Sequence, residues 1–310
     1  MKRQLIVQIS EGLGNQLFMF ANAYAISREN NLDLFIDNKT GYLKKKNLLR
    51  PHQYYLLHRF NLYNFQISND ILSKNFFSIY LKKILTLIER FKKNKLFYRE
   101  KIYKINNKKI INTLATFEPS LYGKKIYIQG NFENEDYFIK YKREINHLFN
   151  PNIKITDELK NYIDKLYNNN SVSLHLRRNR FSDQYNLSNN TDMVKSNNFT
   201  LDIINYINRA TQYIEDHLSK PKYFIWTNDV KNINFFTSKL KIKKFEIINT
   251  NDPIIDFKLF RYSKNFIVGP SSYHWWGAWL NDNQNKICLR PKNINPSNNV
   301  NFWPKDWISI

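Results

Sequence analysis

Two adjacent arginines follow directly on an apolar segment of the chain. The segment reads Ser173-Leu174-His175-Leu176-Arg177-Arg178, and its apolar residues predict a strand over 172–176. In open parallel sheets, ligands bind beyond the carboxyl ends of the strands. A guanidinium group can form two parallel hydrogen bonds with phosphate oxygens. Arg177 and Arg178 are therefore candidates for a phosphate clamp; the alternative is ordinary surface charge in a basic chain.

A second candidate site follows a predicted strand over 266–268. Ser271 and Ser272 stand at the start of an aromatic-rich helix, where hydroxyl groups and free amides are suited to binding phosphate. The same helix carries three tryptophans at helical spacing on an apolar element, and we expect them in the core rather than against a ligand. These are Trp275, Trp276 and Trp279.

Two aspartates lie near other predicted strands. Asp229 follows a strand predicted over 223–226, and Asp256 precedes the serine turn by one helix. The carboxylate of Asp256 can accept hydrogen bonds from a base or a ribose. Both aspartates can equally serve as helix caps, which is a frequent role of aspartate at such positions.

A glycine-containing loop lies near the N-terminus. It runs from Ser10 through Glu11, Gly12, Gly14, Asn15 and Gln16, between a strand predicted over 5–9 and apolar residues at helical spacing. Such a loop lets a ligand approach the backbone and directs helix N-terminal amides at it. The loop lacks the spacing of the dinucleotide fingerprint and the lysine of a P-loop, so a tight turn without a ligand is the alternative.

These candidate residues require a scaffold of alternating strands and helices. A strand over 32–36 closes a first βαβ unit, a later strand covers 126–129, and the pattern between them is irregular and basic. Asn150-Pro151-Asn152 breaks the chain. The elements predicted beyond the break are helices over 155–167 and 201–218 and strands over 172–176, 223–226, 245–248, 266–268 and 287–289. The alternation predicts an α/β protein with two parallel-sheet domains, 1–150 and 151–310, with the final segment in the second domain or packed back on the first.

The composition restricts the class of protein. With 310 residues, 42% of them apolar, the chain can bury a large core, and no apolar run is long enough for a membrane span. The N-terminus lacks the apolar region of a signal peptide, and the single cysteine, Cys288, excludes an internal disulfide and a cysteine-based zinc site. We therefore expect a cytoplasmic protein, in which a metal site would lack its best ligands.

The formal charge of +22 suggests an anionic partner, although nucleotide bias in the gene explains abundant lysine equally well. The segment from Phe76 to Lys93 has the pattern of a basic amphipathic helix. Such a helix can lie on the surface of an anionic membrane. The alternative, which we favour, is an ordinary helix packed on its own domain.

The order of several motifs resembles that of glycosyltransferase family 11, the α-1,2-fucosyltransferases. The resemblance spans nearly the whole chain, except for about 64–122. The matching residues are Gly12-Leu13-Gly14-Asn15-Gln16-Leu17-Phe18, Gly130-Asn131-Phe132, Tyr137-Phe138, His175-Leu176-Arg177-Arg178, Asn228-Asp229, Ser271-Ser272, Trp275-Trp276, Ala278-Trp279-Leu280 and Pro304-Lys305-Asp306-Trp307-Ile308.

The resemblance implies a GT-B fold, in which two Rossmann-like domains face each other across a cleft. It implies that the second domain binds GDP-β-L-fucose and the first mainly a glycan acceptor, lipid-linked in some systems. Fucose would pass with inversion to the 2-hydroxyl of a sugar, usually galactose, in surface glycan synthesis and without an essential metal. Arg177 would stabilise the charge that grows on the β-phosphate, helped by Arg178 and His175, with Ser271 and Ser272 near the diphosphate and Asp256 at guanine.

The chain departs from this family at positions that matter for catalysis. Asn179-Arg180 replaces the usual Gly-Asp after the arginines, which leaves Asp183 as the nearest carboxylate. Glu11 stands where a glycine is usual. An inverting transfer is helped by a base that takes the acceptor's proton, and Glu11 and then Asp183 are the candidates.

Two alternative functions follow from the same sequence. One is a related transferase that uses another GDP-sugar or acceptor, which the changes at Asn179 and Arg180 favour. The other is a basic nucleic-acid-binding protein, which the charge favours but for which the sequence has no recognised motif. We expect a GDP-sugar and a glycan as partners, and no nucleic acid.

Overall fold

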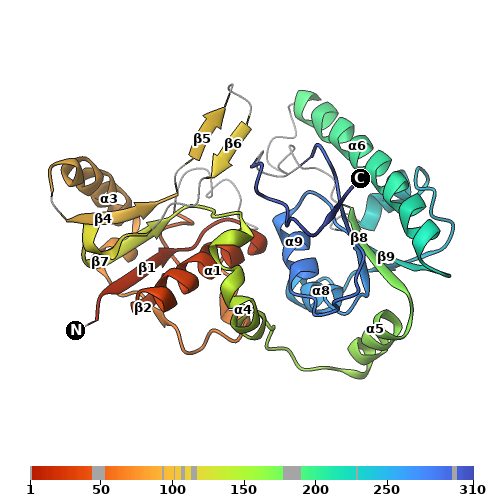
Figure 1. Cartoon of the computed structure of the whole chain (residues 1–310), viewed down its shortest axis with the longest axis horizontal. Coiled ribbons are helices and arrows are strands. Elements are labelled where there is room, and N and C mark those ends of the chain that lie inside the picture. Colours follow the sequence, from red (N-terminus) through yellow and green to blue (C-terminus); the bar gives the residue numbers. More distant parts are fainter. Residues whose placement is uncertain are drawn as a thin grey trace. The chain divides into compact units, whose positions relative to one another are not determined.

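The computed structural model describes residues 2–43, 53–92, 94–100, 102–105, 109–112, 117–176, 190–227, 230–294 and 299–310, with the backbone alone at 90, 102–105, 109–112, 190–193, 232 and 235. The chain divides into two compact units (Figure 1). One unit consists of Met1–Asn152 and Ser297–Pro304, and the other of Ile153–Pro296 and Lys305–Ile310.

The first unit is built on a five-stranded sheet whose neighbouring strands are all parallel, in the order β3-β2-β1-β7-β4. A separate antiparallel pair, β5 with β6, lies outside this sheet. The strands are β1 (Gln4–Gln8), β2 (Asp33–Asp37), β3 (Gln66–Ile67), β4 (Lys95–Arg99), β5 (Ile102–Ile105), β6 (Lys109–Asn112) and β7 (Tyr122–Gln129).

Two helices cover the first sheet. Helix α1 (Leu13–Glu29) contacts β1 and β2 and is buried along almost its whole length. Helix α3 (Phe76–Ile88) packs Leu81 and Leu85 against a cluster that includes Ile6. Because side chains alternate along a strand, the buried neighbours of Ile6 point to the opposite face. The remaining elements of this unit are α4 (Lys142–Leu148) and the short 3₁₀ helices η1 (Leu57–Arg59), η2 (Ile71–Ser73), η3 (Glu89–Phe91), η4 (Pro119–Leu121), η5 (Glu135–Tyr137) and η6 (Ile139–Tyr141).

The second unit has a six-stranded parallel sheet in the order β10-β9-β8-β11-β12-β13. Its strands are β8 (Ser171–Leu176), β9 (Lys222–Thr227), β10 (Phe245–Ile248), β11 (Asn265–Ile267), β12 (Cys288–Arg290) and β13 (Ile308–Ser309). Its helices are α5 (Asp157–Asn168), α6 (Asn190–His217), the 3₁₀ helix η7 (Val230–Asn232), α7 (Ile233–Thr237), α8 (Pro253–Phe260) and α9 (Ser272–Trp279). Apolar residues of α6 join those of β8 and β9 in one core.

The tryptophans of α9 are buried, as predicted: Trp275, Trp276 and Trp279 are at most 2% exposed. Gly277 on the same helix allows α8 to approach, because a Cβ at this position would lie 2.2 Å from the ring of Phe260. The aromatic helix is therefore part of the core and not a stacking surface for a ligand.

The two parallel sheets with their helices confirm the predicted α/β class. Between the second and the last predicted strands of the first domain, the sequence predicted only the helix from Phe76 to Lys93, which the structure has as α3. The strands β3 and β4 and the β5–β6 pair also lie there and were not predicted. Strand β4 reads Lys-Leu-Phe-Tyr-Arg and lies at the edge of its sheet, where charged ends remain solvated. Its sequence therefore lacks the continuous apolar run of a central strand.

Helix α3 is both anchored and exposed. Lys82 is 6% exposed, and its Nζ lies 2.8 Å from Asp37 Oδ2. Much of the helix and the turn after it nevertheless carries large apolar side chains that are 42–91% exposed. These are Phe76, Phe77, Tyr80, Ile84, Leu87, Ile88 and Phe91. Among the described helices, none has the length and apolarity that a bilayer crossing requires.

Candidate functional site

The structure describes nine of the thirteen predicted site residues. The other four lie outside the described residues: Arg177, Arg178, Asp183 and Asp229. In the sequence the two arginines follow Leu176, the last residue of β8. The described candidates belong to two places, one in each unit.

In the second unit, the carboxyl ends of β8 and β11 come close together. The two strands are neighbours in the sheet, and a Cβ on Gly269 would lie 3.1 Å from the backbone oxygen of His175. The rings of His175 and His274 are in contact, and both line a small cavity of about 10 Å³ together with Ser271. This volume is about that of one water molecule. Glycine at 269 thus allows the predicted His175 and Ser271 segments to meet.

The two serines have different positions at the start of α9. Ser271 is the N-cap residue, and its hydroxyl oxygen accepts a hydrogen bond from the backbone N–H of Tyr273 at 3.3 Å. Ser272 is the first residue of the helix and is only partly buried. A capping hydroxyl satisfies one of the free amides of a helix start. Ser271 therefore shapes this helix terminus, while Ser272 presents its hydroxyl nearer to the surface.

Asp256 is held in the first turn of α8. Its Oδ1 accepts hydrogen bonds from the backbone N–H of Thr250 at 3.0 Å and from the Thr250 hydroxyl at 2.8 Å. Burial raises the pKa of Asp256 above its ordinary value, against the lowering effect of the two bonds from Thr250. Two bonds to one oxygen fix the orientation of the carboxylate. A carboxylate with a burial-raised pKa is typical of a functional position, although structural networks produce the same effect.

Tyr273 connects Asp256 with the serine turn. Its hydroxyl donates a hydrogen bond of 2.7 Å to the backbone oxygen of Pro253, at the start of α8. Burial raises the pKa of Tyr273, and the charges of Asp256 and Asp252 add to this. The starts of α8 and α9 are therefore neighbours, so the structure brings Asp256, Ser271 and Ser272 into one region of the second unit.

In the first unit, Glu11 adopts an unusual backbone conformation. Its φ angle is +66°, in the left-handed region that favours glycine. Its Oε2 accepts a hydrogen bond of 2.5 Å from the side-chain amide of Asn15, one turn into α1. This conformation gives a physical reason why a glycine would suit the position, and a glutamate there carries backbone strain.

Gln16 and the two glycines complete the loop. The Gln16 amide is fully buried: its Nε2 donates to the backbone oxygens of Glu11 at 3.0 Å and Tyr54 at 2.7 Å, and its Oε1 accepts from the N–H of Leu56 at 2.9 Å. Both of its N–H groups are thus used within the protein, so Gln16 positions the loop and has no free donor for a ligand. Gly14 is buried, whereas a Cβ on Gly12 would meet open space at the N-cap of α1.

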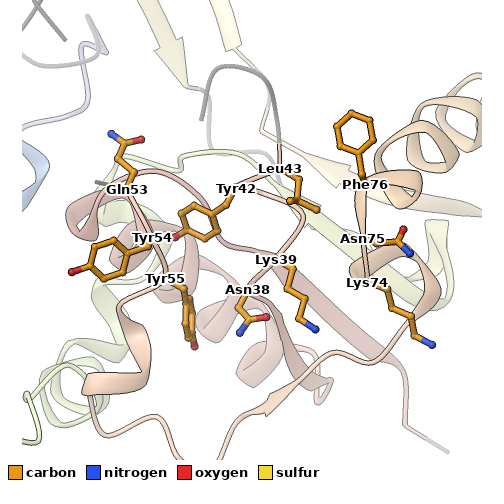
Figure 2. A pocket seen from close by; sticks show the side chains of 10 residues that line it. All are labelled: Asn38, Lys39, Tyr42, Leu43, Gln53, Tyr54, Tyr55, Lys74, Asn75 and Phe76. Atoms are coloured by element: carbon orange, nitrogen blue, oxygen red, sulfur yellow. The ribbon is translucent and has the colours of Figure 1, made fainter. Parts of the chain in front are cut away.

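Sequence reasoning missed a cavity beyond the carboxyl end of β2 (Figure 2). Its volume is about 510 Å³, and residues of 38–43, 53–55 and 74–76 line it. The rule that ligands bind beyond strand ends would have directed attention to Asn38, the residue after β2. Nothing in the sequence indicates that Gln53 and Phe76 lie beside it.

The described residues contain no group of three histidine, cysteine, aspartate or glutamate side chains arranged to hold a metal ion.

Comparisons with known proteins find relatives along the whole chain. No protein-family model matches the sequence. The chain is 26% identical over 313 residues to an alpha-1,2-colitosyltransferase of Escherichia coli, covering 99% of this chain and 98% of the relative. It is also 26% identical over 326 residues to the O-antigen biosynthesis glycosyltransferase WbnK of Escherichia coli, covering 97% and 99%. Both relatives are glycosyltransferases.

The solved structures that resemble this chain have a lower sequence identity to it than these two relatives. The NodZ alpha-1,6-fucosyltransferase soaked with GDP-fucose gives a TM-score of 0.43 at 11% identity, over 90% of this chain and 93% of that one. A mutant of FUT1 from Arabidopsis thaliana in complex with GDP gives 0.49 at 8% identity, over 96% and 72%. Neither TM-score reaches 0.5, so the fold assignment rests on the two parallel sheets of this chain.

Proposed function

We propose that this chain is an inverting glycosyltransferase of the family 11 type. It transfers a 6-deoxy sugar from a GDP-sugar, with GDP-β-L-fucose as the first candidate, to the 2-hydroxyl of a galactose-type acceptor in surface glycan synthesis. The observation that carries the proposal is the similarity over nearly the full length to two glycosyltransferases, one of them specific for an α-1,2 linkage by name. The paired α/β units agree with it.

The donor is proposed to bind at the carboxyl edge of the second sheet. The described residues supply an oriented carboxylate at Asp256 and the start of α9 at Ser271 and Ser272. Asp256 would accept hydrogen bonds from guanine. Arg177 would stabilise the charge that grows on the β-phosphate as the sugar bond breaks, because a guanidinium binds a phosphate more strongly as its charge increases. No metal is proposed for this step.

The transferred sugar has two candidates, L-fucose and colitose. Colitose is L-fucose without the 3-hydroxyl group, so both sugars present the same methyl group and the same anomeric centre. One relative is a colitosyltransferase by name, which supports GDP-colitose as the alternative donor. The replacement of the usual Gly-Asp by Asn179-Arg180 supports a change in this part of the site.

Product analysis tests the function directly. Purified protein is mixed with GDP-L-fucose or GDP-L-colitose and a panel of galactose-terminated oligosaccharides, and the linkage is read by NMR. We expect an α-1,2-linked product with one of the two donors. This product should be lost in Arg177→Ala and retained in Arg209→Ala. Arg209 is a suitable control because it lies in an exposed position on α6, where it donates a hydrogen bond to the backbone oxygen of Asn205. No product with either donor, together with no thermal stabilisation by GDP, would contradict the proposal.

The nucleic-acid alternative predicts a different result. It requires tight binding of arbitrary single-stranded DNA that weakens steeply with salt and is unchanged in Arg177→Ala.

We also propose that α3 attaches the protein to an anionic membrane surface. Its apolar side chains, Phe77 and Leu87 among them, are exposed, and the same segment carries the exposed Lys83 and Lys92. Apolar side chains with flanking lysines are the combination that interfacial helices use. This attachment would bring a lipid-linked acceptor within reach of the enzyme.

A further inference from the structure

The cavity beyond β2 has the size and the lining of a small-molecule site. About 510 Å³ falls within the usual range of such sites, and the lining combines aromatic rings with a few polar groups. Figure 2 shows its lining side chains on three separate segments of the first unit. None of the thirteen residues predicted from the sequence belongs to it.

Three polar atoms of this lining have no hydrogen-bond partner. They are Asn38 Oδ1, Tyr42 OH and Gln53 Oε1, which are buried and unpaired within the part of the chain that the structure describes. Buried polar groups are nearly always paired, and leaving one unpaired is unfavourable. Two of the three are carbonyl oxygens and the third is a hydroxyl, so the natural partners are the hydroxyl groups of a ligand.

Aromatic rings supply a surface of the other kind. Tyr54 is 54% exposed and Phe76 is 50% exposed, so each aromatic ring has apolar surface that a ligand could cover. Tyr55 is partly buried, and its burial raises its pKa to about 12, so its hydroxyl stays neutral and can donate. A pyranose ring presents C–H groups on one face and hydroxyl groups at its edge. Rings with accepting oxygens beside them match both features.

The walls of the cavity are fixed by hydrogen bonds. Asp37 Oδ1 accepts from the backbone N–H groups of Lys39 at 3.2 Å and Thr40 at 2.9 Å, and Lys82 of α3 donates to both Asp37 and Thr40 at 2.8 Å. These bonds hold the segment that carries Asn38 and Tyr42. A site that is ordered before binding loses less entropy when its ligand arrives.

The Gln16 amide connects this cavity to the Glu11 loop. One nitrogen atom donates to the backbone oxygens of both Glu11 and Tyr54, so the two segments lie within two hydrogen bonds of each other. Burial raises the pKa of Tyr42, and its interactions with Tyr55 and Glu11 raise it further, so the hydroxyl of Tyr42 stays neutral.

We propose that this cavity binds the terminal sugar ring of the glycan acceptor, with the hydroxyl groups of the sugar paired to Asn38, Tyr42 and Gln53 and its C–H face against Tyr54 or Phe76. The inference rests on the proposed transferase function and adds its acceptor subsite. Glu11 would then lie at the edge of the acceptor site, where a base for the reacting hydroxyl is needed.

Sugar binding can be measured without any transfer reaction. Saturation-transfer NMR is recorded with lactose and with galactosyl-β-1,3-N-acetylgalactosamine as probes, in the absence of donor. We expect saturation of the galactose protons in the wild type and a loss of about tenfold in affinity in Tyr54→Ala. A tenfold loss is about 1.4 kcal/mol, near the upper end of what an aromatic contact contributes. Tyr63→Ala is the matched control, because Tyr63 is 78% exposed and does not line the cavity.

Tyr42→Phe is the second variant because it removes only the unpaired hydroxyl. We expect a higher melting temperature without ligand together with weaker sugar binding, a combination that a merely structural tyrosine would not give. In the transfer assay, both variants should raise the acceptor KM at least about tenfold, and the thermal shift produced by GDP should stay as in the wild type.

The outcomes separate the two proposals. Transfer that proceeds with an unchanged acceptor KM in both variants would overturn the acceptor subsite and leave the transferase function standing. Sugar binding in the NMR experiment without transfer or GDP binding would support the cavity and contradict the transferase. No saturation of either disaccharide by the wild type would overturn the cavity assignment.

Discussion

Replacement of Glu11 is the sharpest test of the catalytic proposal, because two substitutions separate its charge from its backbone strain. Glu11→Gln keeps an oxygen that can accept the Asn15 hydrogen bond and removes only the charge and the basicity. Glu11→Gly removes the side chain and places the favoured residue at φ +66°.

The expected effects on stability are small. A non-glycine residue in the left-handed region costs about 1–2 kcal/mol, which Glu11→Gly regains. The same variant loses the hydrogen bond from Asn15, about 1.5–3 kcal/mol for a charged partner, so the free energy of unfolding should fall by no more than about 2 kcal/mol. Glu11→Gln should change it by less than about 1 kcal/mol.

The expected effect on catalysis is large. A positioned general base contributes about 10²–10⁴-fold, so both variants should lower kcat by that factor while the thermal shift by GDP remains. Steady-state transfer rates and thermal melts on the same samples measure the two quantities. Glu29→Gln is the control, since this glutamate ends the same helix and its side chain is 46% exposed.

Turnover within about threefold of the wild type in Glu11→Gln would refute Glu11 as the base. Asp183 would then be the remaining candidate.

Four further predictions address the donor site, the loop, the metal and the membrane. Burial raises the folded-state pKa of Asp256, so its contribution to stability is present below the ordinary pKa of aspartate and is lost as the pH rises through the raised value. Asp256→Asn should therefore melt at a higher temperature than the wild type at pH 7, and this difference should shrink toward pH 4. The variant should also bind GDP at least about tenfold more weakly in calorimetry. Equal GDP affinity would exclude a guanine contact. Gly12→Ala places a methyl group in open space, so its melting temperature should stay within a few degrees of that of the wild type. If a ligand approaches the backbone there, the KM for the donor or the acceptor should rise. Unchanged kinetics would argue against such an approach. Dialysis against EDTA should leave the transfer rate unchanged, and a loss restored by Mg²⁺ or Mn²⁺ would refute the metal-free proposal. The wild type should pellet with phosphatidylglycerol vesicles and not with phosphatidylcholine, and the double variant Phe77→Ser/Leu87→Ser should lose this binding while Ile139→Ser keeps it; equal pelleting with both lipids would contradict an anionic docking surface.

The central strands and the helices of the second unit were predictable because their apolar patterns are local. Strand β9 lies inside its sheet and occupies Lys222–Thr227, one residue beyond each end of the predicted range 223–226. The predicted helix 155–167 matches α5 closely. The edge strand β4 was not predictable in the same way, because only Phe97 and Tyr98 of its five residues are buried and need to be apolar. Local patterns report burial, and an edge strand is only half buried.

Part of the candidate site was also predictable from local sequence, and part of it was not. Strand ends placed the Asp256 and Ser271 segments correctly at one edge, because parallel strands fix where their loops emerge. The left-handed backbone of Glu11 could not be predicted from a glutamate, since residue type alone reports the preferred conformation and not the one that the fold imposes. The cavity was not predictable because its lining comes from segments that lie far apart in the sequence. The Gln16 amide, which donates to the backbone oxygens of Glu11 and Tyr54, is one link between such segments.

Phe76 belongs to two surfaces at once. It lines the cavity beyond β2, and it is the first residue of α3, whose apolar side chains are exposed. The cavity therefore opens beside the surface that we propose to rest on lipid. For an acceptor tethered to the same bilayer, the quantity that governs encounter is then the surface density of the acceptor and not its concentration in solution. Soluble disaccharides would underestimate how readily this enzyme is saturated, and a lipid-tethered galactoside in vesicles would reach half-saturation at a far lower total amount.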